Sequence, residues 1–308
     1  MALIFHSTLN PANIWEPALK NHIPDLDFRT WEEPGDPADI DMALCWKPPA
    51  GGLAKFPNLK VIFSLAAGVD HLFGDPDLPD VPVVRMVEPS LTAGVAEYIV
   101  LHVMRHHKDQ LRFAEQQKAK VWQEFFAPPA WTRRVGILGF GVLGSTAAGM
   151  LRAIGFQLAG WSRSPKQVEG VDSFHGPDQL GDLVARSDIL VSVLPKTAET
   201  EDVLNAALFA RMPKGASLIN CGRGIQLVEQ DLLDALESGQ LSQATLDVFR
   251  EEPLPVGHPF WSHPKITVTP HSGGDPFPES AAQAVAENIL RFRNGEPLPN
   301  IARREDGY

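Results

Sequence analysis

The chain has 308 residues, of which 44% are hydrophobic and 21% are charged, and it carries a formal net charge of −11. This length is enough for two domains with separate cores, and the composition is that of an ordinary globular protein. The acidic balance argues against a nucleic-acid-binding surface, and no apolar run of the sequence is long enough to cross a bilayer. The two cysteines, Cys45 and Cys221, provide no disulfide framework and suit a reducing cytoplasm.

Short apolar runs alternate with helical patterns through the first ninety residues, which is typical of an α/β fold with a parallel sheet. From Ser90 the apolar residues recur at helical spacing and predict a long amphipathic helix. The polar, proline-interrupted stretch "EQQKAKVWQEFFAPPAW" then reads as a connector. A second α/β series begins at Arg134, and its strand candidates are "VGILGFG", "QLAGWSR", "DILVSVL", "SLINCGRG", "ATLDVF" and "ITVTPH". A final helix is predicted over about residues 279–294.

Residues 139–144 read GFGVLG, a G-x-G-x-x-G pattern between a strand candidate and a helical pattern. That context is typical of a dinucleotide-binding turn, although a glycine-rich turn without function can carry the same letters. Gly139 would permit the tight turn, Gly141 would let the backbone approach a pyrophosphate, and Gly144 would let helix and strand pack closely. The amides at the helix start would bind the phosphates. The predicted cofactor site also includes the residues between these glycines: Phe140, Val142 and Leu143.

The second strand of this series ends in "GWSRSPK", at the position where an NAD-binding fold places an acidic residue for the ribose hydroxyls. No acid occurs there. A carboxylate would repel a 2′-phosphate, whereas a guanidinium flanked by hydroxyl groups would hold one. The alternative is a solvated basic turn. We therefore expect NADP as the preferred cofactor, with NAD left open, and the predicted contacts are Ser162, Arg163, Ser164 and Lys166.

Three strand candidates of the second series end in residues suited to acid–base or anion-binding chemistry. Arg223 follows one strand, Asp247 ends another, and His271 follows the last. Ligands of a doubly wound sheet bind outside the carboxyl ends of the strands, so these residues are expected at the same cleft as the glycine loop. Hydride transfer to a carbonyl carbon needs a proton donor and an electrostatic clamp on the oxygen. Histidine suits the first role and arginine the second, while a carboxylate beside the histidine would fix its ring.

The glycines beside Arg223, Gly222 and Gly224, are expected to let the backbone pass close to a ligand. Taken singly, Arg223 could be a structural ion-pair partner and His271 a satisfied core histidine. Cys221 reads as a small packed residue and not as a nucleophile, since no base is assigned to it.

Two further features leave alternatives open. His102 and His106 share a helical face beside His107, but no further ligands of suitable spacing occur, so we predict no metal site. Trp46, after the second strand candidate, belongs either to the core or to the wall of the pocket.

Taken together, the motifs resemble those of the D-isomer-specific 2-hydroxyacid dehydrogenases and, within that family, its glyoxylate/hydroxypyruvate reductase A group. The resemblance covers nearly the whole chain, and the order of arginine, glutamate and histidine is the family's. It rests on "AAGVDH" (66–71), "GILGFGVLG" (136–144), "LPKTAET" (194–200), "INCGRG" (219–224), "DVFREEPLP" (247–255) and "TPHSGG" (269–274).

The resemblance implies a role for each residue of the catalytic set. Arg223 would bind and polarise the substrate, His271 would be the acid and base, and Glu252 would be the carboxylate partner of His271. Glu251 is the neighbour that could be confused with Glu252, but the family's glutamate directly precedes the proline, here Pro253.

The resemblance also implies binding residues outside the catalytic set. Ala67 and Gly68 match the loop whose backbone amides bind the substrate carboxylate. Asp247 is expected to face the cofactor or to support the site without taking part in the chemistry. The remaining implied cofactor contacts are Trp161, Leu194, Pro195, Thr200, Cys221 and Gly222.

The implied architecture is two doubly wound parallel-sheet domains. A Rossmann-type cofactor domain, residues 95–276, would be inserted into a flavodoxin-like substrate domain, residues 1–94 and 277–308. The expected activity is NADPH-dependent reduction of small 2-oxoacids, glyoxylate and hydroxypyruvate, to 2-hydroxyacids by a cytoplasmic homodimer without nucleic-acid or membrane partners. The alternatives are a cofactor-sensing binding protein with secondary catalysis and a reductase for another 2-oxoacid.

Overall fold

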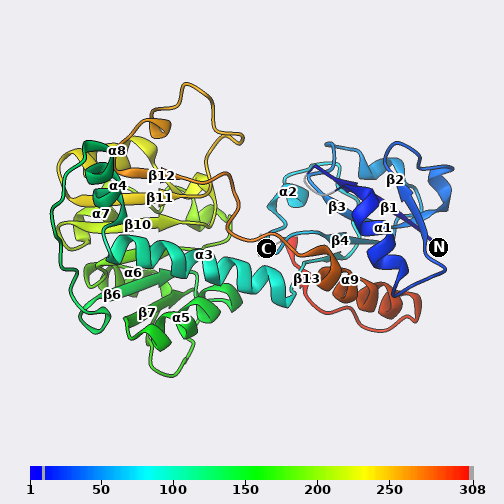
Figure 1. The fold of residues 1–308 in the computed structure, drawn as a ribbon. Helices are drawn as coiled ribbons and strands as arrows, with labels where there is room; N and C mark the ends of the chain where they lie inside the picture. Colours follow the sequence, from blue (N-terminus) through cyan, green and yellow to red (C-terminus); the bar gives the residue numbers. More distant parts are fainter. Residues whose placement is uncertain (9–10, 305–308) are drawn as a thin grey trace. The chain divides into compact units, whose positions relative to one another are not determined.

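The computed structural model describes residues 1–8 and 11–304, and the chain divides into two compact units (Figure 1). The terminal unit comprises residues 1–91 and 275–308, and the inserted unit comprises residues 92–274. The chain therefore leaves the terminal unit once and returns to it once, as expected for one domain inserted into another.

The sheet of the inserted unit is parallel throughout, with the strand order β12-β11-β10-β9-β6-β7-β8. Counted along this unit, the order is 3-2-1-4-5-6 with one more strand at the edge, which is the Rossmann arrangement. The order reverses between β6 and β9, where such a sheet opens a crevice for its ligand. The strands are β6 (Arg134–Leu138), β7 (Gln157–Ser162), β8 (Asp172–His175), β9 (Ile189–Ser192), β10 (Ala216–Asn220), β11 (Leu241–Leu246) and β12 (Ile266–Val268).

Helices cover both faces of this sheet, which explains why its strands read as continuous apolar runs. One face packs on α3 (Pro89–His107) and α5 (Val142–Ile154) through residues such as Ile99 and Leu151. The other face packs on three helices through residues such as Leu183 and Phe209. These helices are α6 (Gly176–Ala185), α7 (Ala206–Arg211) and α8 (Glu229–Glu237). Short 3₁₀ turns are η3 (Ala130–Thr132), η4 (Ala198–Thr200), η5 (Gly224–Gln226) and η6 (Pro259–Trp261).

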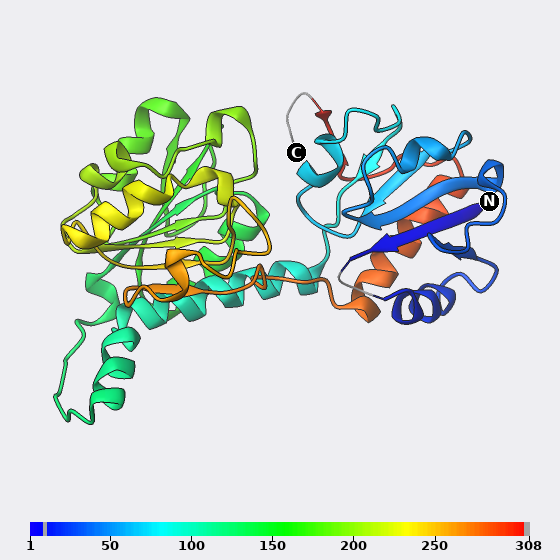
Figure 2. The ribbon, with the colours of Figure 1, turned by 90° about the horizontal axis from the view of Figure 1, so that it is seen from above.

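The stretch expected to be a connector begins as a helix. Helix α4 (Gln110–Ala119) has no buried residue, and Figure 2 shows it projecting from the body of the inserted unit together with the segment that follows. Its glutamines, arginine, lysine, glutamate and alanines are strong helix formers, so local propensity supports a helix that contributes little to the core. Residues 121–129 after it have no regular structure.

The described part of the terminal unit forms a sheet with the order β13-β5-β4-β3-β1-β2, in which only β13 is antiparallel. The parallel strands follow the order 2-1-3-4-5, which is the flavodoxin arrangement. Helices α1 (Ala12–Lys20) and α9 (Pro278–Arg293) cover one face through Trp15 and Ile289. The other face packs on α2 (Asp70–Phe73) and η2 (Leu53–Lys55). The strands are β1 (Ala2–Ser7), β2 (Asp27–Thr30), β3 (Ile40–Trp46), β4 (Val61–Ser64), β5 (Val83–Val84) and β13 (Ile301–Ala302).

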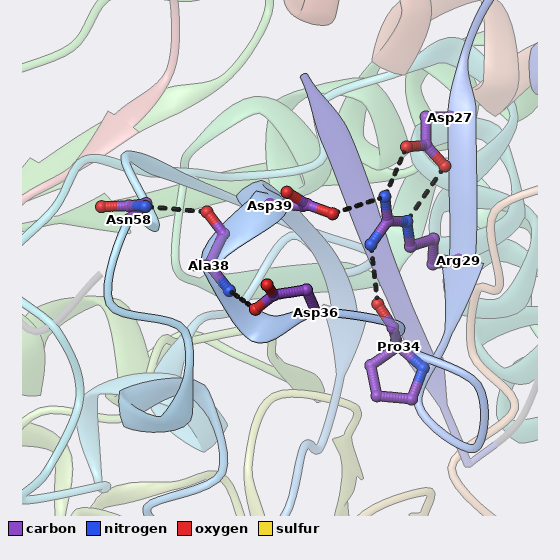
Figure 3. A network of polar contacts seen from close by, with 7 residues as sticks. All are labelled: Asp27, Arg29, Pro34, Asp36, Ala38, Asp39 and Asn58. Atoms are coloured by element: carbon purple, nitrogen blue, oxygen red, sulfur yellow. Dashed lines mark hydrogen bonds and ion pairs between the residues drawn. The ribbon is translucent and has the colours of Figure 1, made fainter.

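A single arginine organises the loop between β2 and β3, which includes η1 (Pro37–Asp39). Figure 3 shows the Arg29 guanidinium donating to the carboxylates of Asp27 and Asp39 and to the carbonyl of Pro34, at 2.8, 3.2 and 3.0 Å. The network is largely exposed, so it orders the loop without adding much to stability. Across the described residues, no helix combines the length and the apolar character needed to span a membrane.

Candidate active site

The three glycines of the loop after β6 differ in how closely other atoms of the protein approach them. Gly139 has a φ of 96°, and a Cβ there would lie 2.6 Å from the Val193 carbonyl oxygen. A Cβ on Gly144 would clash with the Gly139 carbonyl, whereas a Cβ on Gly141 would have no atom within 4 Å. The fold itself therefore requires Gly139 and Gly144. Gly141, directly before α5, leaves open space at the helix start, where a phosphate group would be stabilised.

The residues between these glycines are placed differently from one another. Phe140 is 1% exposed and packs directly on Gly160, while Val142 is 59% exposed and Leu143 is partly buried. The backbone amides of Gly139 and Phe140 both donate to the Trp161 carbonyl, at 3.1 and 2.9 Å. The Phe140 side chain and the Trp161 backbone thus support the loop from within the protein.

The end of β7 is basic and exposed. Ser162 donates to the Ser164 carbonyl at 2.8 Å, and Arg163, Ser164 and Lys166 all face solvent. A charge of opposite sign, Glu199 on η4, lies close enough to be affected by Arg163. The pKa of Glu199 is lowered by its own backbone hydrogen bond, by the Thr197 hydroxyl and then by the positive charge of Arg163. Arg163 therefore lies within electrostatic reach of the loop after β9.

That loop, residues 194–200, is held by Thr200. The Thr200 hydroxyl donates to the Pro195 carbonyl at 2.8 Å and accepts from the Thr197 amide at 2.9 Å. Leu194 is 5% exposed and Thr200 is 8% exposed. Thr200, expected from sequence to contact the cofactor, is placed where it shapes the loop.

Arg223 lies in the segment that follows β10. Its Nη1 donates to the Gly222 carbonyl at 2.8 Å, and the Asn220 side chain caps the turn through the Gly222 amide and the Arg223 carbonyl. A Cβ on Gly222 would lie 2.6 Å from Gln226 Oε1, and one on Gly224 would clash with the Phe249 backbone. The surrounding protein atoms alone therefore require glycine at both positions, and the expectation that they also bring the backbone close to a ligand stays a prediction.

Glu252 and His271 form a pair. His271 Nδ1 lies 2.8 Å from Glu252 Oε2, and Glu252 Oε1 accepts from the Phe249 amide at 3.1 Å. Both side chains are partly exposed, at 33% for His271 and 23% for Glu252. The carboxylate is fixed at one oxygen and faces the ring with the other, so the imidazole is oriented while its second nitrogen remains for other partners.

Asp247 holds the turn that carries His271. Its carboxylate is 1% exposed and accepts from the Thr269 hydroxyl at 2.6 Å, the Ser272 amide at 2.9 Å and the Gly273 amide at 2.8 Å. The Asp247 carbonyl accepts from the His271 amide at 2.8 Å. His271 has a φ of 53°, a left-handed conformation that costs a non-glycine residue about 1 kcal/mol or more. These bonds to Asp247 hold the histidine in that conformation.

The network extends to Tyr98 of α3, which the sequence motifs do not single out. The Tyr98 hydroxyl lies 2.7 Å from the Thr269 hydroxyl. Burial first, and the Asp247 charge second, raise the pKa of Tyr98 and of the Cys221 thiol. Both groups therefore stay protonated, and Cys221 is a packed thiol whose Sγ lies 3.5 Å from the Ser192 carbonyl. A buried tyrosine hydroxyl usually has a hydrogen-bond partner, so a tyrosine on the apolar side of a predicted helix is the one feature of the sequence that indicates this bond.

The substrate-loop candidates lie in the terminal unit. Trp46 ends β3, is 9% exposed and lies with its ring 4.3 Å from that of His71, measured between centroids. Ala67 and Gly68 follow β4 and are partly exposed. Since β3 and β4 are parallel neighbours, all three residues belong to the carboxyl edge of that sheet.

The histidines of α3 are used in packing. His106 places its two ring nitrogens 2.9 Å from the hydroxyls of Ser217 and Thr245. Burial lowers the pKa of His106 to about 3 and that of His102 to about 4, and the charge of Arg105 adds to both effects. Within residues 1–8 and 11–304, no group of three or more histidine, cysteine, aspartate or glutamate side chains is arranged to hold a metal ion.

The reactive side chains share one edge of the inserted unit's sheet. The strands β10, β11 and β12 are parallel neighbours, and Arg223, Asp247 and His271 follow their carboxyl ends. The glycine loop follows β6, and residues 194–200 follow β9, on the same edge. This edge can hold a dinucleotide on the glycine loop and present a proton donor and a cation to a carbonyl compound.

Comparison with known proteins supports this interpretation. Residues 100–273 match the family model described as "D-isomer specific 2-hydroxyacid dehydrogenase, NAD binding domain". A protein named glyoxylate/hydroxypyruvate reductase A from Serratia proteamaculans is 41% identical, with 100% of each chain covered. A relative of the same name from Yersinia enterocolitica is 39% identical over the full length of both chains.

Two solved structures have the same fold over their whole length. A D-isomer specific 2-hydroxyacid dehydrogenase from Xanthobacter autotrophicus, in complex with NADPH and MES, is 43% identical with a TM-score of 0.96 and covers 100% of this chain and 99% of its own. An NADPH-dependent glyoxylate/hydroxypyruvate reductase from Sinorhizobium meliloti, in complex with NADP and sulfate, is 35% identical with a TM-score of 0.94 and 100% of both chains covered.

Proposed function

Because the chain belongs to the D-isomer specific 2-hydroxyacid dehydrogenase family, we propose that it reduces small 2-oxoacids, glyoxylate and hydroxypyruvate, to 2-hydroxyacids with NADPH. The observation that carries this proposal is the His271–Glu252 pair, 2.8 Å apart, on the strand edge that also carries Arg223 and the glycine loop. The relatives named above support the choice of substrates and cofactor.

The residues of the inserted unit fit a phosphorylated dinucleotide. When bound, NADPH supplies the hydride. The open space at Gly141 and the amides at the start of α5 receive the pyrophosphate. Arg163 and Lys166, with no carboxylate near them on β7, hold the 2′-phosphate. The remaining residues of the loops after β6, β7 and β9 line the rest of the cofactor site.

His271 acts as the proton donor in reduction and as the base in oxidation. Glu252 accepts from Nδ1, so Nε2 is the nitrogen that serves the substrate oxygen. The turn held by Asp247 keeps the ring in place between turnovers. General acid catalysis by a positioned histidine is worth about a hundredfold or more in rate.

Arg223 binds the carboxylate of the 2-oxoacid and polarises its carbonyl group. In the terminal unit, Ala67 and Gly68 are proposed to bind a substrate carboxylate through their backbone amides, and Trp46 to limit the space beside a bound substrate. Small substrates are therefore preferred over bulky ones such as phenylpyruvate.

We also propose a cytoplasmic homodimer. Three aromatic side chains in the segment after α4 are largely exposed to solvent: Trp122 by 95%, Phe126 by 85% and Trp131 by 68%. Exposed aromatic clusters of this kind mark interaction surfaces. The two free cysteines suit a reducing compartment. Sedimentation at micromolar concentration tests the dimer, and a Trp122→Ser, Phe126→Ser variant should sediment as a monomer.

The test of the activity is a steady-state assay that follows NADPH oxidation with glyoxylate, hydroxypyruvate and phenylpyruvate. We expect turnover of the first two and little of the third. NADPH binding without turnover of any 2-oxoacid would favour a cofactor-sensing protein instead. Preference for phenylpyruvate would show a reductase of another substrate class.

A further inference from the structure

We infer that Gln226 is a positioning residue that couples the substrate arginine to the cofactor loop. The inference deepens the proposed function and rests on it for the roles of Arg223 and of residues 194–195. Gln226 is the last residue of η5 and is 0% exposed. Neither the sequence motifs nor the acid–base chemistry draws attention to it.

The carboxamide of Gln226 makes four hydrogen bonds. Its Oε1 accepts from the Ser192 hydroxyl at 3.1 Å and from the Arg223 amide at 3.2 Å. Its Nε2 donates to the carbonyls of Leu194 and Pro195 at 2.9 and 3.0 Å. Two acceptor sites and two donor hydrogens are the full capacity of a glutamine side chain. Every one of them is used.

The partners of Gln226 lie on two neighbouring strand ends. Ser192 ends β9, and Leu194 and Pro195 begin the loop expected at the cofactor. Arg223 lies three residues after the end of β10. A fully satisfied buried polar network rigidifies its surroundings. One side chain therefore sets where the arginine backbone lies relative to the loop.

The backbone around Gln226 also packs tightly against the carboxamide and its partners. The Gln226 amide donates to the Arg223 carbonyl at 3.2 Å, and its carbonyl accepts from the Leu204 amide at 2.8 Å. A Cβ on Gly222 would lie 2.6 Å from Oε1 and 2.8 Å from the Leu194 carbonyl. Gly222 thus lets the turn approach both the carboxamide and the loop that the carboxamide binds.

The side chains of Arg250 and Arg223, near η5, bind groups other than the Gln226 carboxamide. Arg250 donates to the carbonyls of Leu227 and Ile225 and forms an ion pair with Asp202. The side chain of Arg223 points its Nη1 at the Gly222 carbonyl. The four hydrogen-bond partners of the Gln226 carboxamide given above are uncharged groups, so native Gln226 brings no titration of its own to this link.

The inserted unit offers a matched control glutamine. Gln240 directly precedes β11, at the opposite end of that strand from Asp247. Its Nε2 also donates to two backbone carbonyls, those of Phe209 and Met212, at 2.8 and 2.9 Å. Loss of these bonds should lower stability without reaching the proposed site.

The experiment compares Gln226→Met with Gln240→Met, since methionine keeps much of the side chain's length and removes its hydrogen bonds. We expect Gln226→Met to raise KM for NADPH and for glyoxylate together, each by about tenfold, because donors and acceptors at both loops lose their partner. Gln240→Met should lower the unfolding midpoint and leave both KM values within about twofold of the native values. Unchanged KM values in Gln226→Met, with a similar loss of stability, would overturn the inference.

A second variant covers the case in which Gln226→Met fails to fold. Gln226→Glu keeps the shape, but an ionised carboxylate would face the Leu194 and Pro195 carbonyls without a donor. We expect its KM for NADPH to approach the native value at low pH, where the carboxyl is protonated, and to rise as the pH increases. A KM that follows the native pH profile would contradict the inference.

The proposed function and this inference can fail separately. If the native chain turns over neither glyoxylate nor hydroxypyruvate, the proposed function is wrong. NADPH affinity, measured by nucleotide fluorescence, still decides the role of Gln226 through residues 194–195. Weaker NADPH binding in Gln226→Met than in Gln240→Met would support the inference, and equal binding would overturn it.

Discussion

Asp247 and His106 are both buried polar residues of the inserted unit, exposed by 1% and 5%, but they bond to different kinds of partner. Asp247 accepts from backbone amides of the turn that carries His271. His106 bonds to the hydroxyls of Ser217 and Thr245, which lie on two strands beneath α3. The first arrangement fixes a loop and the second fixes a helix against a sheet. The comparison predicts that changes around Asp247 act on turnover, whereas changes at His106 act on stability.

The largest expected effect is at the side chain that the Asp247 network presents. We expect His271→Ala to lower kcat for glyoxylate reduction by about a hundredfold or more, because the positioned proton donor is lost. The affinity for NADPH should stay close to native, since the glycine loop and the basic turn after β7 are untouched. A variant that retains native kcat with an unchanged pH profile would remove His271 from the mechanism.

Asp247→Asn tests whether the turn itself matters. An amide group can accept on one side only, so its NH2 would oppose either the Gly273 amide or the Ser272 and Thr269 donors. We expect kcat to fall by about tenfold to a hundredfold through displacement of His271. Tyr98→Phe is the milder control, because it removes only the hydroxyl that bonds to Thr269 and leaves Asp247 in place. Its loss of kcat should be smaller than that of Asp247→Asn. Equal losses in both variants would show that the network acts through packing alone.

Sequence reasoning selects candidate residues whose chemistry is visible in their side chains. The glycine loop, Arg223, Glu252 and His271 stand in recognisable patterns, and the alternation of strands and helices predicted both parallel sheets. It could not identify Tyr98 as a polar partner, because the Thr269 hydroxyl that it meets lies 171 residues further along the chain. Gln226 was missed for a related reason. Most of its partners are backbone groups, which are the same for almost every residue type and leave no signal in the sequence.

The same limit applies to two further expectations. Gly222 and Gly224 are predicted to bring the backbone close to a ligand, and they are also needed where the turn after β10 packs on Gln226 and on the Phe249 backbone. A glycine in a sequence indicates a close approach without saying what approaches. The connector before Arg134 begins as helix α4, because good helix formers make a helix there without burying any residue.

Arg163 is an exposed basic residue directly after the carboxyl end of β7. We expect Arg163→Ala to raise KM for NADPH by about tenfold and to leave KM for NADH almost unchanged, since charge-assisted bonds to the 2′-phosphate are lost. Asp at this position should weaken NADPH binding further. The effect should shrink at high salt because Arg163 is exposed. An equal rise for both nucleotides would show that the β7 turn is only a solvated basic loop.

The smallest effect on activity is expected at His106, where the comparison predicts a change in stability alone. Burial lowers the pKa of His106 from 6.5 to about 3 in the folded protein. As the pH falls below 6.5, His106 therefore binds a proton in the unfolded chain but stays neutral in the folded protein. The free energy of unfolding decreases progressively towards pH 3. Above that range the contribution of the neutral ring is complete.

Gln in place of His106 removes this titration and can still bond to one of the two hydroxyls. We expect His106→Gln to be less stable than the native protein at about pH 7.5, where the native ring makes both hydrogen bonds. Between about pH 7.5 and about pH 5 it should lose less free energy of unfolding than the native protein does, and urea titrations at the two values measure that difference. The kcat and KM values at neutral pH should remain native, because Ser217 and Thr245 lie in the strands and not in the loops that follow them. A drop in kcat comparable to that of Asp247→Asn would mean that the helix interface and the catalytic turn are coupled, and that the division between the two regions does not hold.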